Sequence, residues 1–300
     1  MSPFVSIITV NYNEPEVTCE MLDSLYRHIH TPFECIVVDN GSTVDEAVII
    51  GKRFPQAIVL RSNKNLGFAG ANNLAMAHAS ARYFLLLNND TTVEEDILPP
   101  LLKRFSQSER IGAVGPKIRF EGGERPIQFA GYTPMTPISL RNRLIGCDEP
   151  DKGQYNIAKP TPAILGAAMM VSKEVVEKVG MLPESYFLYY EELDWCEQIG
   201  RAGFEMWYEP EVTVFHKGSV TAGGKESPVR VYYQTRNRLL FARRNRTAAQ
   251  RWLSYLFQLA VSYPKECLRN LLQKRPELLI WRTRGIIDFV LNRDTFLNKS

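Results

Sequence analysis

Short runs of β-branched and aliphatic residues alternate with amphipathic segments over the first 115 residues of this chain. Such alternation is typical of βαβ units, in which helices join parallel strands and cover the sheet. We therefore expect an α/β fold with a Rossmann-like, mostly parallel sheet sandwiched by helices. The expected strands are Phe4–Asn11, Phe33–Asp39, Ala57–Leu60, Tyr83–Asn88 and Ile111–Gly115, and the expected helices are Val17–His28, Val44–Phe54, Ala69–Ser80 and Glu95–Phe105.

The remainder of the chain is less regular. Residues 120–160 are rich in Gly, Pro and polar side chains without clear periodicity, which predicts a long excursion over the sheet rather than a second core. After Pro228 the pattern is helical and basic to the end. Between these regions we expect a strand at Ala163–Val171, a helix from Ser172, a helix around Glu191–Ala202 and a strand at Met206–Phe215.

Cysteine use and hydropathy limit the class of protein. The five cysteines are odd in number, widely spaced and include no C-x-x-C pair, so we expect neither a disulfide framework nor a zinc knuckle. This pattern predicts a reducing, cytoplasmic location. Met1 leads directly into the apolar run Phe4–Val10, and the longest apolar stretches are about half of the ~20 residues that a spanning helix needs. We expect neither a signal peptide nor a transmembrane helix.

Polar side chains follow four of the expected strands at the point where each strand ends. In an open parallel sheet, ligands bind outside the carboxyl ends of the strands. A single Asn or Asp after a strand is more often a turn or a helix cap. Four polar tips that converge on one edge indicate a ligand site instead. These tips are Asn11-Tyr12-Asn13, Asp39-Asn40-Gly41-Ser42, 63–70 and Asn88-Asn89-Asp90.

The chemistry of these tips suits a nucleotide. A carboxylate such as Asp39 at the second tip can accept hydrogen bonds from a ribose or a base ring, and Tyr12 offers a face for stacking. The G-x-G-x-x-G fingerprint is missing, because residues 65–70 differ from it and do not follow the first strand, and a P-loop is absent too. A diphosphate would therefore need a metal ion, for which Asp90 offers a hard oxygen ligand.

The same segments resemble the successive motifs of glycosyltransferase family 2. They read VSIITVNYN at 5–13, VVDNGS at 37–42, NLGFAGANN at 65–73 and LLNND at 86–90. More narrowly, the chain resembles bacterial rhamnosyltransferase-like members that build cell-surface polysaccharides. The resemblance implies a GT-A fold, a nucleotide-diphosphate sugar donor, a divalent metal, inversion at the anomeric carbon, and a glycan or lipid-linked glycan acceptor. The residues that it assigns to the nucleotide sugar are Val10, Tyr12, Asp39, Asn65, Gly67, Asn73, Asn88 and Asn89.

The resemblance also implies a metal site. Asn88-Asn89-Asp90 stands at the family's D-x-D position with Asp90 as the ligand, and two of its three places hold Asn, which lowers the charge of the site. His216 resembles the histidine that completes this site, although a lone histidine at a strand end is more often structural. With two phosphate oxygens and water, these ligands would make a six-coordinate site for Mn²⁺ or Mg²⁺, and the imidazole favours Mn²⁺.

An acidic segment at 189–196 supplies candidates for catalysis. An inverting transferase needs a carboxylate that takes the proton of the acceptor hydroxyl, and by resemblance Glu192 is this general base. The family usually has Asp there, so Glu191 and Asp194 are alternatives, and a dipole-stabilised first helical turn is the non-catalytic explanation. The residues that the resemblance assigns to the donor sugar or acceptor are Gly166, Ala167, Trp195 and Arg236.

Charge is divided unevenly along the chain. Residues 236–300 carry 14 Lys or Arg against 4 Asp or Glu, whereas residues 1–235 have a net charge of −7. We expect a GT-A domain at 1–235, with a nucleotide-binding half at 1–118 and an acceptor and catalytic half at 119–235. A basic helical extension at 236–300 completes the expected organisation.

The extension contains an apolar stripe with helical spacing between arginines. Such a stripe most often packs on its own domain, but the basic flanks also fit an interfacial helix on anionic lipid. The extension lacks the motif of a nucleic-acid reader, so we expect no nucleic acid partner. We expect a cytoplasmic protein, and the sequence leaves both arrangements of the stripe open, packing on its own domain or peripheral contact with the membrane. The stripe comprises Trp252, Tyr255, Leu256, Leu259, Ala260 and Tyr263.

Two other functions compete with sugar transfer. A sugar nucleotidyltransferase shares the nucleotide fold, but it requires a Gly-rich basic phosphate loop near the N-terminus, and residues 9–18 offer none. A non-catalytic sugar-binding protein of polysaccharide assembly would not need Glu192, Asp90 and His216 together. Donor-dependent release of nucleoside diphosphate separates the three functions.

Overall fold

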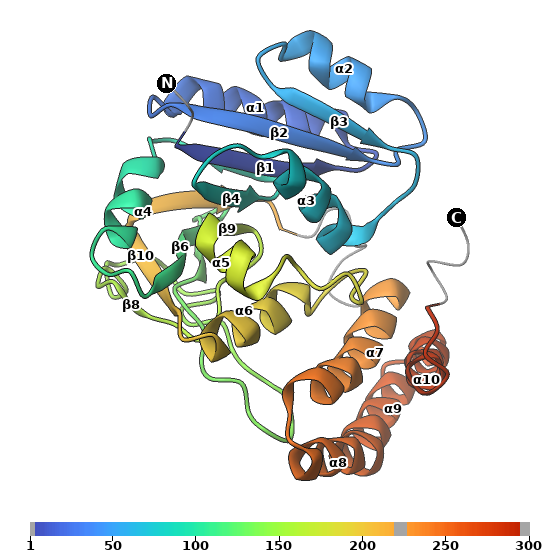
Figure 1. Ribbon diagram of the computed structural model, residues 1–300. Helices are drawn as coiled ribbons and strands as arrows, with labels where there is room; N and C mark the ends of the chain where they lie inside the picture. The colour runs from blue at the N-terminus through green and yellow to red at the C-terminus, as the bar shows by residue number, and fades with distance from the viewer. Residues whose placement is uncertain (1–3, 219–226, 295–300) are drawn as a thin grey trace. The chain divides into compact units, whose positions relative to one another are not determined.

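The computed structural model describes residues 4–218 and 227–294, whose secondary structure is drawn in Figure 1. The chain forms two compact units. Among the described residues, the first unit comprises 4–133, 143–185 and 191–218, and the second comprises 134–142, 186–190 and 227–294. No helix within these described ranges is long and apolar enough to cross a membrane.

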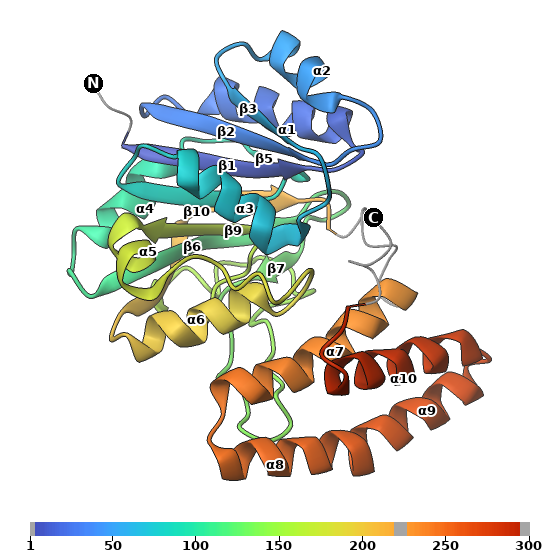
Figure 2. The same cartoon turned by 45° about the vertical axis from the view of Figure 1, so that its right-hand side comes forward.

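A ten-stranded sheet forms the centre of the first unit, with helices on both of its faces (Figures 1 and 2). Four parallel strands form one side of it, in the order β3 (Ile58–Ser62), β2 (Phe33–Asn40), β1 (Val5–Asn11) and β4 (Tyr83–Leu87). All five residues of β4 are buried, as expected of a strand covered on both faces. The predicted α/β fold with helices around a central sheet is confirmed.

The direction of the strand connections determines which face of the sheet each of the first three helices covers. Helices α1 (Pro15–His28) and α2 (Glu46–Arg53) lead from β1 to β2 and from β2 to β3, whereas α3 (Gly67–His78) leads back from β3 to β4. Because crossovers between parallel strands are right-handed, α1 and α2 cover one face and α3 covers the other. Local sequence sets where these helices begin, since Pro15 occupies the first turn of α1 and the Asp45 carboxylate caps α2.

The other side of the sheet mixes parallel and antiparallel pairs. Strand β9 lies between β4 and β6 and runs antiparallel to both, while β10 runs parallel to β6 and antiparallel to β5. This pairing places His216, the last residue of β10, opposite Thr91, the first residue of β5. The strands are β5 (Thr91–Val93), β6 (Ile111–Phe120), β7 (Ile127–Phe129), β8 (Lys159–Pro160), β9 (Ala168–Ser172) and β10 (Glu205–His216).

Three further helices pack on this side. Helix α4 (Leu98–Phe105) packs on β6 and β10, and α5 (Lys173–Val179) begins at the side-chain cap of Ser172, as predicted. Helix α6 (Glu191–Arg201) packs on β10 and closely matches the predicted helix. Residues 121–158 form the predicted excursion, in which Ile127 and Phe129 belong to the main core rather than to a second one.

The strand predicted at Ala163–Val171 is shorter than expected. Strand β9 begins at Ala168, and the residues before it form a turn in which the Ala168 N–H donates to the Leu165 carbonyl at 3.2 Å. Gly166 and Ala167 therefore lie in a turn rather than at the centre of a strand. The Ala167 carbonyl accepts a hydrogen bond from the Asn88 N–H at 3.0 Å, so the turn lies beside the end of β4.

The second unit is helical. Its long helix α7 (Pro228–Asn245) packs along α10 (Pro276–Val290), and a β-carbon on Gly285 would lie 2.8 Å from the Tyr232 carbonyl oxygen. Glycine is thus required for this close crossing. In the sequence, α7 and α10 are joined by α8 (Ala248–Phe257), a π-helical turn at Gln258–Ser262, and α9 (Tyr263–Leu272).

The helical layer from α8 to α9 has an unusual distribution of side chains. Its buried positions are polar and include Ser254, Gln258, Ser262 and Asn270. Its exposed positions include large apolar side chains, with Trp252 and Leu256 about two-thirds exposed at 66% and 64% and Leu272 at 75%. The distribution is the opposite of that in a helix that packs an apolar face on a core, where apolar side chains are buried and polar ones exposed. Most of the predicted apolar stripe is therefore not covered by its own unit.

Candidate active site

The structure brings together the two residues predicted to hold a metal. His216 Nε2 lies 3.0 Å from Asp90 Oδ1, and both side chains are buried. The antiparallel pairing of β10 with β5 produces this contact, because Thr91 directly follows Asp90. The Lys217 N–H also donates to the Asp90 carbonyl at 2.9 Å, which fixes the backbone of the pair.

Gln128 on β7 orients the imidazole of His216. Its Oε1 lies 2.8 Å from His216 Nδ1, a distance at which an Nδ1–H group donates to the amide oxygen. His216 Nε2 then faces Asp90 Oδ1 at 3.0 Å, where the two atoms can share a proton or a cation. Ligands about 2.1 Å from one ion and at right angles lie about 3 Å apart, so the spacing fits a shared divalent cation.

Asp90 and His216 would offer an ion one oxygen and one nitrogen ligand. Within 4–218 and 227–294, no group of three or more His, Cys, Asp or Glu side chains is arranged to hold a metal ion. An ion held by Asp90 and His216 would therefore need further oxygen ligands from water or from a bound molecule. This arrangement suits a site that is completed by a diphosphate.

The tips of β1 and β4 are linked by hydrogen bonds. Asn89 Nδ2 donates to Thr18 Oγ1 at 3.1 Å, and Thr18 Oγ1 donates to Asn11 Oδ1 at 2.7 Å. Asn88 and Asn89 are partly exposed, whereas Asn11 and Thr18 are buried. Asn88 and Asn89 directly precede Asp90. The buried side chains of Asn11 and Thr18 connect the tip of β1 to Asn89.

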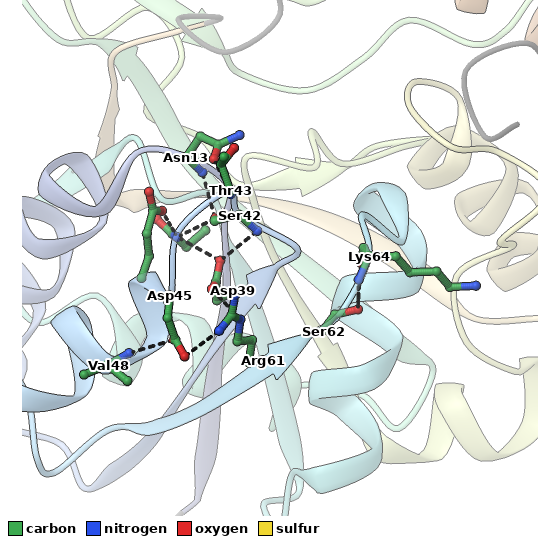
Figure 3. Close-up of polar contacts among 11 residues, drawn as sticks. Asn13, Asp39, Ser42, Thr43, Asp45, Val48, Arg61, Ser62 and Lys64 are labelled. Atoms are coloured by element: carbon green, nitrogen blue, oxygen red, sulfur yellow. Dashed lines mark hydrogen bonds and ion pairs between the residues drawn. The ribbon is translucent and has the colours of Figure 1, made fainter. Parts of the chain in front are cut away.

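The tip of β2 carries a buried carboxylate with an unsatisfied oxygen (Figure 3). Asp39 is fully buried, and its Oδ1 lies 3.4 Å from both Asn11 Nδ2 and the Ser42 N–H. Its Oδ2 accepts no hydrogen bond from the described residues, and the nearest cationic atom is Arg61 Nε at 3.7 Å. Figure 3 shows Arg61 reaching from β3 toward both Asp39 and Asp45. An unsatisfied carboxylate oxygen fits a donor group of a ligand, such as a base N–H or a ribose hydroxyl.

Other residues predicted to bind the nucleotide sugar make hydrogen bonds to the protein itself. Asn65 Oδ1 accepts from the Gly67 N–H at 2.8 Å, and Gly67 has a φ of 72°, so the two form the turn into α3. Asn73 Nδ2 donates to the Leu182 carbonyl at 2.9 Å. Val10 is partly buried on β1, and the ring of Tyr12 is exposed beyond its end.

The acidic segment begins α6, and burial distinguishes its three carboxylates. Glu191 and Asp194 are buried, and Asp194 accepts a hydrogen bond from Gln198. Glu192 is partly exposed. Burial raises the pKa of the Glu192 carboxyl above its usual range, and the N–H groups of Glu192 and Leu193 act in the opposite direction. Glu192 is thus the acid of this segment best placed to meet a ligand.

Gly166 leaves the space beside Glu192 open. A β-carbon on Gly166 would lie 3.6 Å from Glu192 Cβ and 3.7 Å from the Phe68 ring. The turn at 166–167 therefore contacts Glu192 on one side and, through the hydrogen bond to Asn88, the end of β4 on the other. The turn at 166–167 thus lies between Glu192 and Asn88, which follows the end of β4 two residues before Asp90.

Two further predicted residues have partners within their own units. Trp195 is fully buried and donates its indole N–H to the Gly180 carbonyl at 2.9 Å, which makes it part of the core. Arg236 lies on α7 in the second unit, where its Nε donates to the Arg293 carbonyl at 3.0 Å. Sequence reasoning missed Gln128, which lies in the irregular excursion, and Glu46, which accepts from Asn11 at 2.7 Å.

Residues 6–179 match the family model described as glycosyl transferase family 2. The chain belongs to glycosyl transferase family 2. The family resemblance of the strand-tip motifs is thereby confirmed, and the protein is a glycosyltransferase.

Two relatives are similar in sequence to this glycosyltransferase. The low-salt glycan biosynthesis hexosyltransferase of Haloferax volcanii is 29% identical over 240 residues, which cover 79% of this chain and 74% of the relative. The N-acetylglucosaminyl-diphospho-decaprenol L-rhamnosyltransferase of Mycobacterium tuberculosis is 24% identical over 243 residues, 74% of this chain and 79% of the relative.

Solved structures confirm the GT-A fold of the glycosyltransferase. A mannosyltransferase from Pyrobaculum calidifontis, in complex with GDP-Man and Mn²⁺, matches with a TM-score of 0.59 at 15% identity over 98% of this chain and 89% of its own. Residues 1–349 of TarS from S. aureus match with a TM-score of 0.58 at 17% identity over 96% of this chain and 81% of their own.

Proposed function

We propose that this glycosyltransferase moves a hexose from a nucleoside-diphosphate sugar to a glycan or lipid-linked glycan acceptor, with inversion and with a divalent metal. The observation that carries the proposal is the contact of Asp90 with His216 just beyond the end of β4, together with the turn at 166–167 that joins the end of β4 to Glu192. Rhamnose, from a dTDP or UDP donor, is the proposed sugar because a relative is a rhamnosyltransferase.

The roles of the side chains follow from their chemistry. Asp39 accepts from the base or ribose of the donor through its unsatisfied Oδ2. Asp90 and His216 would hold Mn²⁺ or Mg²⁺, which when bound supplies positive charge to the departing diphosphate. Glu192 accepts the proton of the acceptor hydroxyl as its oxygen attacks the anomeric carbon. Attack from the face opposite the leaving group in a single displacement inverts that centre.

The raised pKa of Glu192 suits a base. A carboxylate with an elevated pKa takes a proton more readily near neutral pH than an ordinary one. Since burial raises this pKa, we expect kcat to fall with decreasing pH along an acid limb that lies above the usual range of glutamate. The amide of Glu192→Gln has no such titration.

The experiment that tests the function measures release of nucleoside diphosphate from dTDP-, UDP- and GDP-sugars in the presence of Mn²⁺. Glu192→Gln keeps the shape of the side chain but cannot take a proton, so kcat should fall by about 10²- to 10⁴-fold with donor binding nearly intact. Glu192→Asp, which restores the family's usual residue, should keep measurable activity. Asp194→Asn and Glu191→Gln are the matched controls and should cost less.

Two results would contradict this assignment. Full turnover in Glu192→Gln with an inactive Asp194→Asn would move the base to Asp194. Release of pyrophosphate, or of no product with any donor, would favour the nucleotidyltransferase or the non-catalytic sugar-binding alternative.

We also propose that the second unit contacts the cytoplasmic surface of a membrane through its reversed helical layer. This layer exposes Trp252, Leu256 and Leu272 and buries polar side chains, which is the distribution expected where the outer surface meets lipid. Exposed basic side chains lie in the same region, including Lys265, Arg269 and Lys274. Their charge complements anionic headgroups, so the proposed occupant of this face is an anionic bilayer. A lipid-linked acceptor would be presented at the same surface.

A further inference from the structure

A small pocket lies within the helical second unit, lined by side chains of α7, the π-helical turn, α9 and α10. It is partly open to solvent and has room for roughly one or two water-sized groups. The pocket can therefore take a small polar group. The lining residues that concern its chemistry are Thr235, Arg238, Gln258, Leu259, Ser262 and Arg282.

The π-helical turn brings polar side chains to this pocket. The Tyr263 N–H donates to the Gln258 carbonyl, five residues back, and Pro264 follows directly. A proline in a helix lacks the N–H of the usual bond and crowds the carbonyl four residues before it, which favours the wider turn. Gln258 and Ser262 are buried in the helical layer from α8 to α9, and both line the pocket. The buried polar side of this layer thus borders a polar pocket at these two positions.

The positive charge that lines the pocket is poorly neutralised. Arg238 Nε donates to the Tyr190 hydroxyl at 2.8 Å, and Arg238 has no other hydrogen bond and no ion pair with the described residues. Arg282 Nη2 lies 3.4 Å from Glu266 Oε2, which Arg269 approaches more closely, at 2.7 Å. Within the described part of the chain, neither arginine of the pocket therefore has a carboxylate of its own.

Arg282 is largely buried, with 12% of its side chain exposed, and its donors are only partly used. Its Nη1 lies 3.4 Å from Thr235 Oγ1, and its buried Nε donates to none of the described residues. Burial lowers the pKa of this guanidinium, which Glu266 opposes and the neighbouring Arg238 reinforces. A buried guanidinium with an unused donor favours a negatively charged acceptor at this position.

We propose that this pocket binds a phosphate group, supplied either by a phospholipid headgroup or by a soluble phosphate. Guanidinium groups present pairs of N–H donors that match phosphate oxygens, and several terminal oxygens allow one phosphate to accept from both Arg238 and Arg282. Leu259 lines the pocket and is also 48% exposed, so the pocket borders the layer that exposes apolar side chains. The proposal does not depend on the sugar-transfer site of the first unit.

The first experiment titrates the full chain with inorganic phosphate, observed by ³¹P NMR at constant ionic strength in chloride. EDTA is present, so that no metal ion recruits phosphate to Asp90 and His216. We expect saturable binding that Arg238→Gln and Arg282→Gln each weaken by about tenfold or more. Arg238→Lys keeps the charge without the planar pair of donors and should still lose several-fold in affinity.

The matched control for these variants is Arg251→Gln. It removes the same charge from α8 at a position that does not line the pocket, and it should bind phosphate as the unaltered chain does. Melting temperatures show which variants fold. If Arg282→Gln does not fold, the two substitutions of the partly exposed Arg238 decide the outcome.

The second experiment identifies the source of the phosphate by vesicle sedimentation. Phosphatidylcholine vesicles contain either phosphatidate or cholesteryl hemisuccinate, which carries a carboxylate, at matched zeta potential. If a lipid supplies the phosphate, the chain should prefer phosphatidate, and Arg238→Gln should lose this preference while Arg251→Gln keeps it. If the ligand is a soluble phosphate, both vesicles should bind equally while inorganic phosphate still binds in the first experiment.

Two results would overturn the proposal. One is the absence of both saturable phosphate binding and a preference for phosphatidate. The other is an equal loss of phosphate affinity in Arg251→Gln and in the pocket variants, which would show a general effect of charge. Neither experiment measures sugar transfer, so both results leave the roles proposed for Glu192, Asp90 and His216 unchanged.

Discussion

At the scale of single residues, the metal pair gives the sharpest expectation. If Asp90 and His216 hold the ion, Asp90→Asn should abolish activity and should weaken nucleotide binding only when Mn²⁺ or Mg²⁺ is present, because the ion joins the diphosphate to the protein. Calorimetric titration of the nucleoside diphosphate with metal and with EDTA measures both conditions. The control Asp23→Asn removes the same charge from an exposed site on α1 and should alter neither. An equal loss of affinity in EDTA would contradict the metal assignment.

The resemblance to glycosyltransferase family 2 implied the pairing of Asp90 with His216 even though 126 positions separate the two residues. The same reasoning could not single out Gln128, which lies in a segment without periodicity and acts only through the imidazole that it orients. The resemblance assigned Glu192 as the base and left Glu191 and Asp194 as alternatives. Burial, which depends on how the helix packs, distinguishes Glu192 from Glu191 and Asp194.

At the scale of elements, the loop after β2 depends on Gly41. Its φ is 76°, and a β-carbon there would lie 2.4 Å from the Lys64 carbonyl carbon. Gly41→Ala should therefore destabilise the protein by more than the ~1–2 kcal/mol of the left-handed conformation alone and should weaken nucleotide binding, because the loop carries Ser42 beside Asp39. Gly123→Ala is the matched control, since Gly123 has a φ of 56° and open space around its β-carbon. Equal melting temperatures of the two variants would contradict the clash.

The alternation of apolar runs predicted the helices and strands up to β6, except for the three-residue strand β5, which is too short to show a periodic pattern. Residues 163–167 were predicted as strand because they are apolar, and in the structure they lie outside the sheet with Ala163, Ile164 and Ala167 buried. The antiparallel direction of β9 could not be predicted. A buried apolar run of five residues has the same pattern whichever strands it pairs with.

At the scale of the whole molecule, the second unit should bind anionic vesicles. Replacing Trp252, Leu256 and Leu272 by Glu removes about 1.5–3 kcal/mol of apolar burial at each position and adds negative charge, so binding in a vesicle sedimentation assay should fall by at least 10²-fold. Ile157→Glu is the control, because Ile157 is 80% exposed in the first unit. Unchanged vesicle binding in the triple variant, or equal loss in Ile157→Glu, would contradict the proposed lipid-facing surface.

The position of β9 between β4 and β6 has a consequence for how the chain is made. Within residues 1–118, β6 has no neighbouring strand, since it pairs with β7, β9 and β10, and β4 has one open edge. A nascent chain of this length therefore exposes the wholly apolar strand Tyr83–Leu87 to other unpaired edges. It stays in that state until β9 is complete at Ser172, 54 residues later, roughly 3–11 s at usual rates of translation. Protection of this edge during synthesis, for instance by a chaperone that binds extended apolar segments, becomes part of the protein's biogenesis.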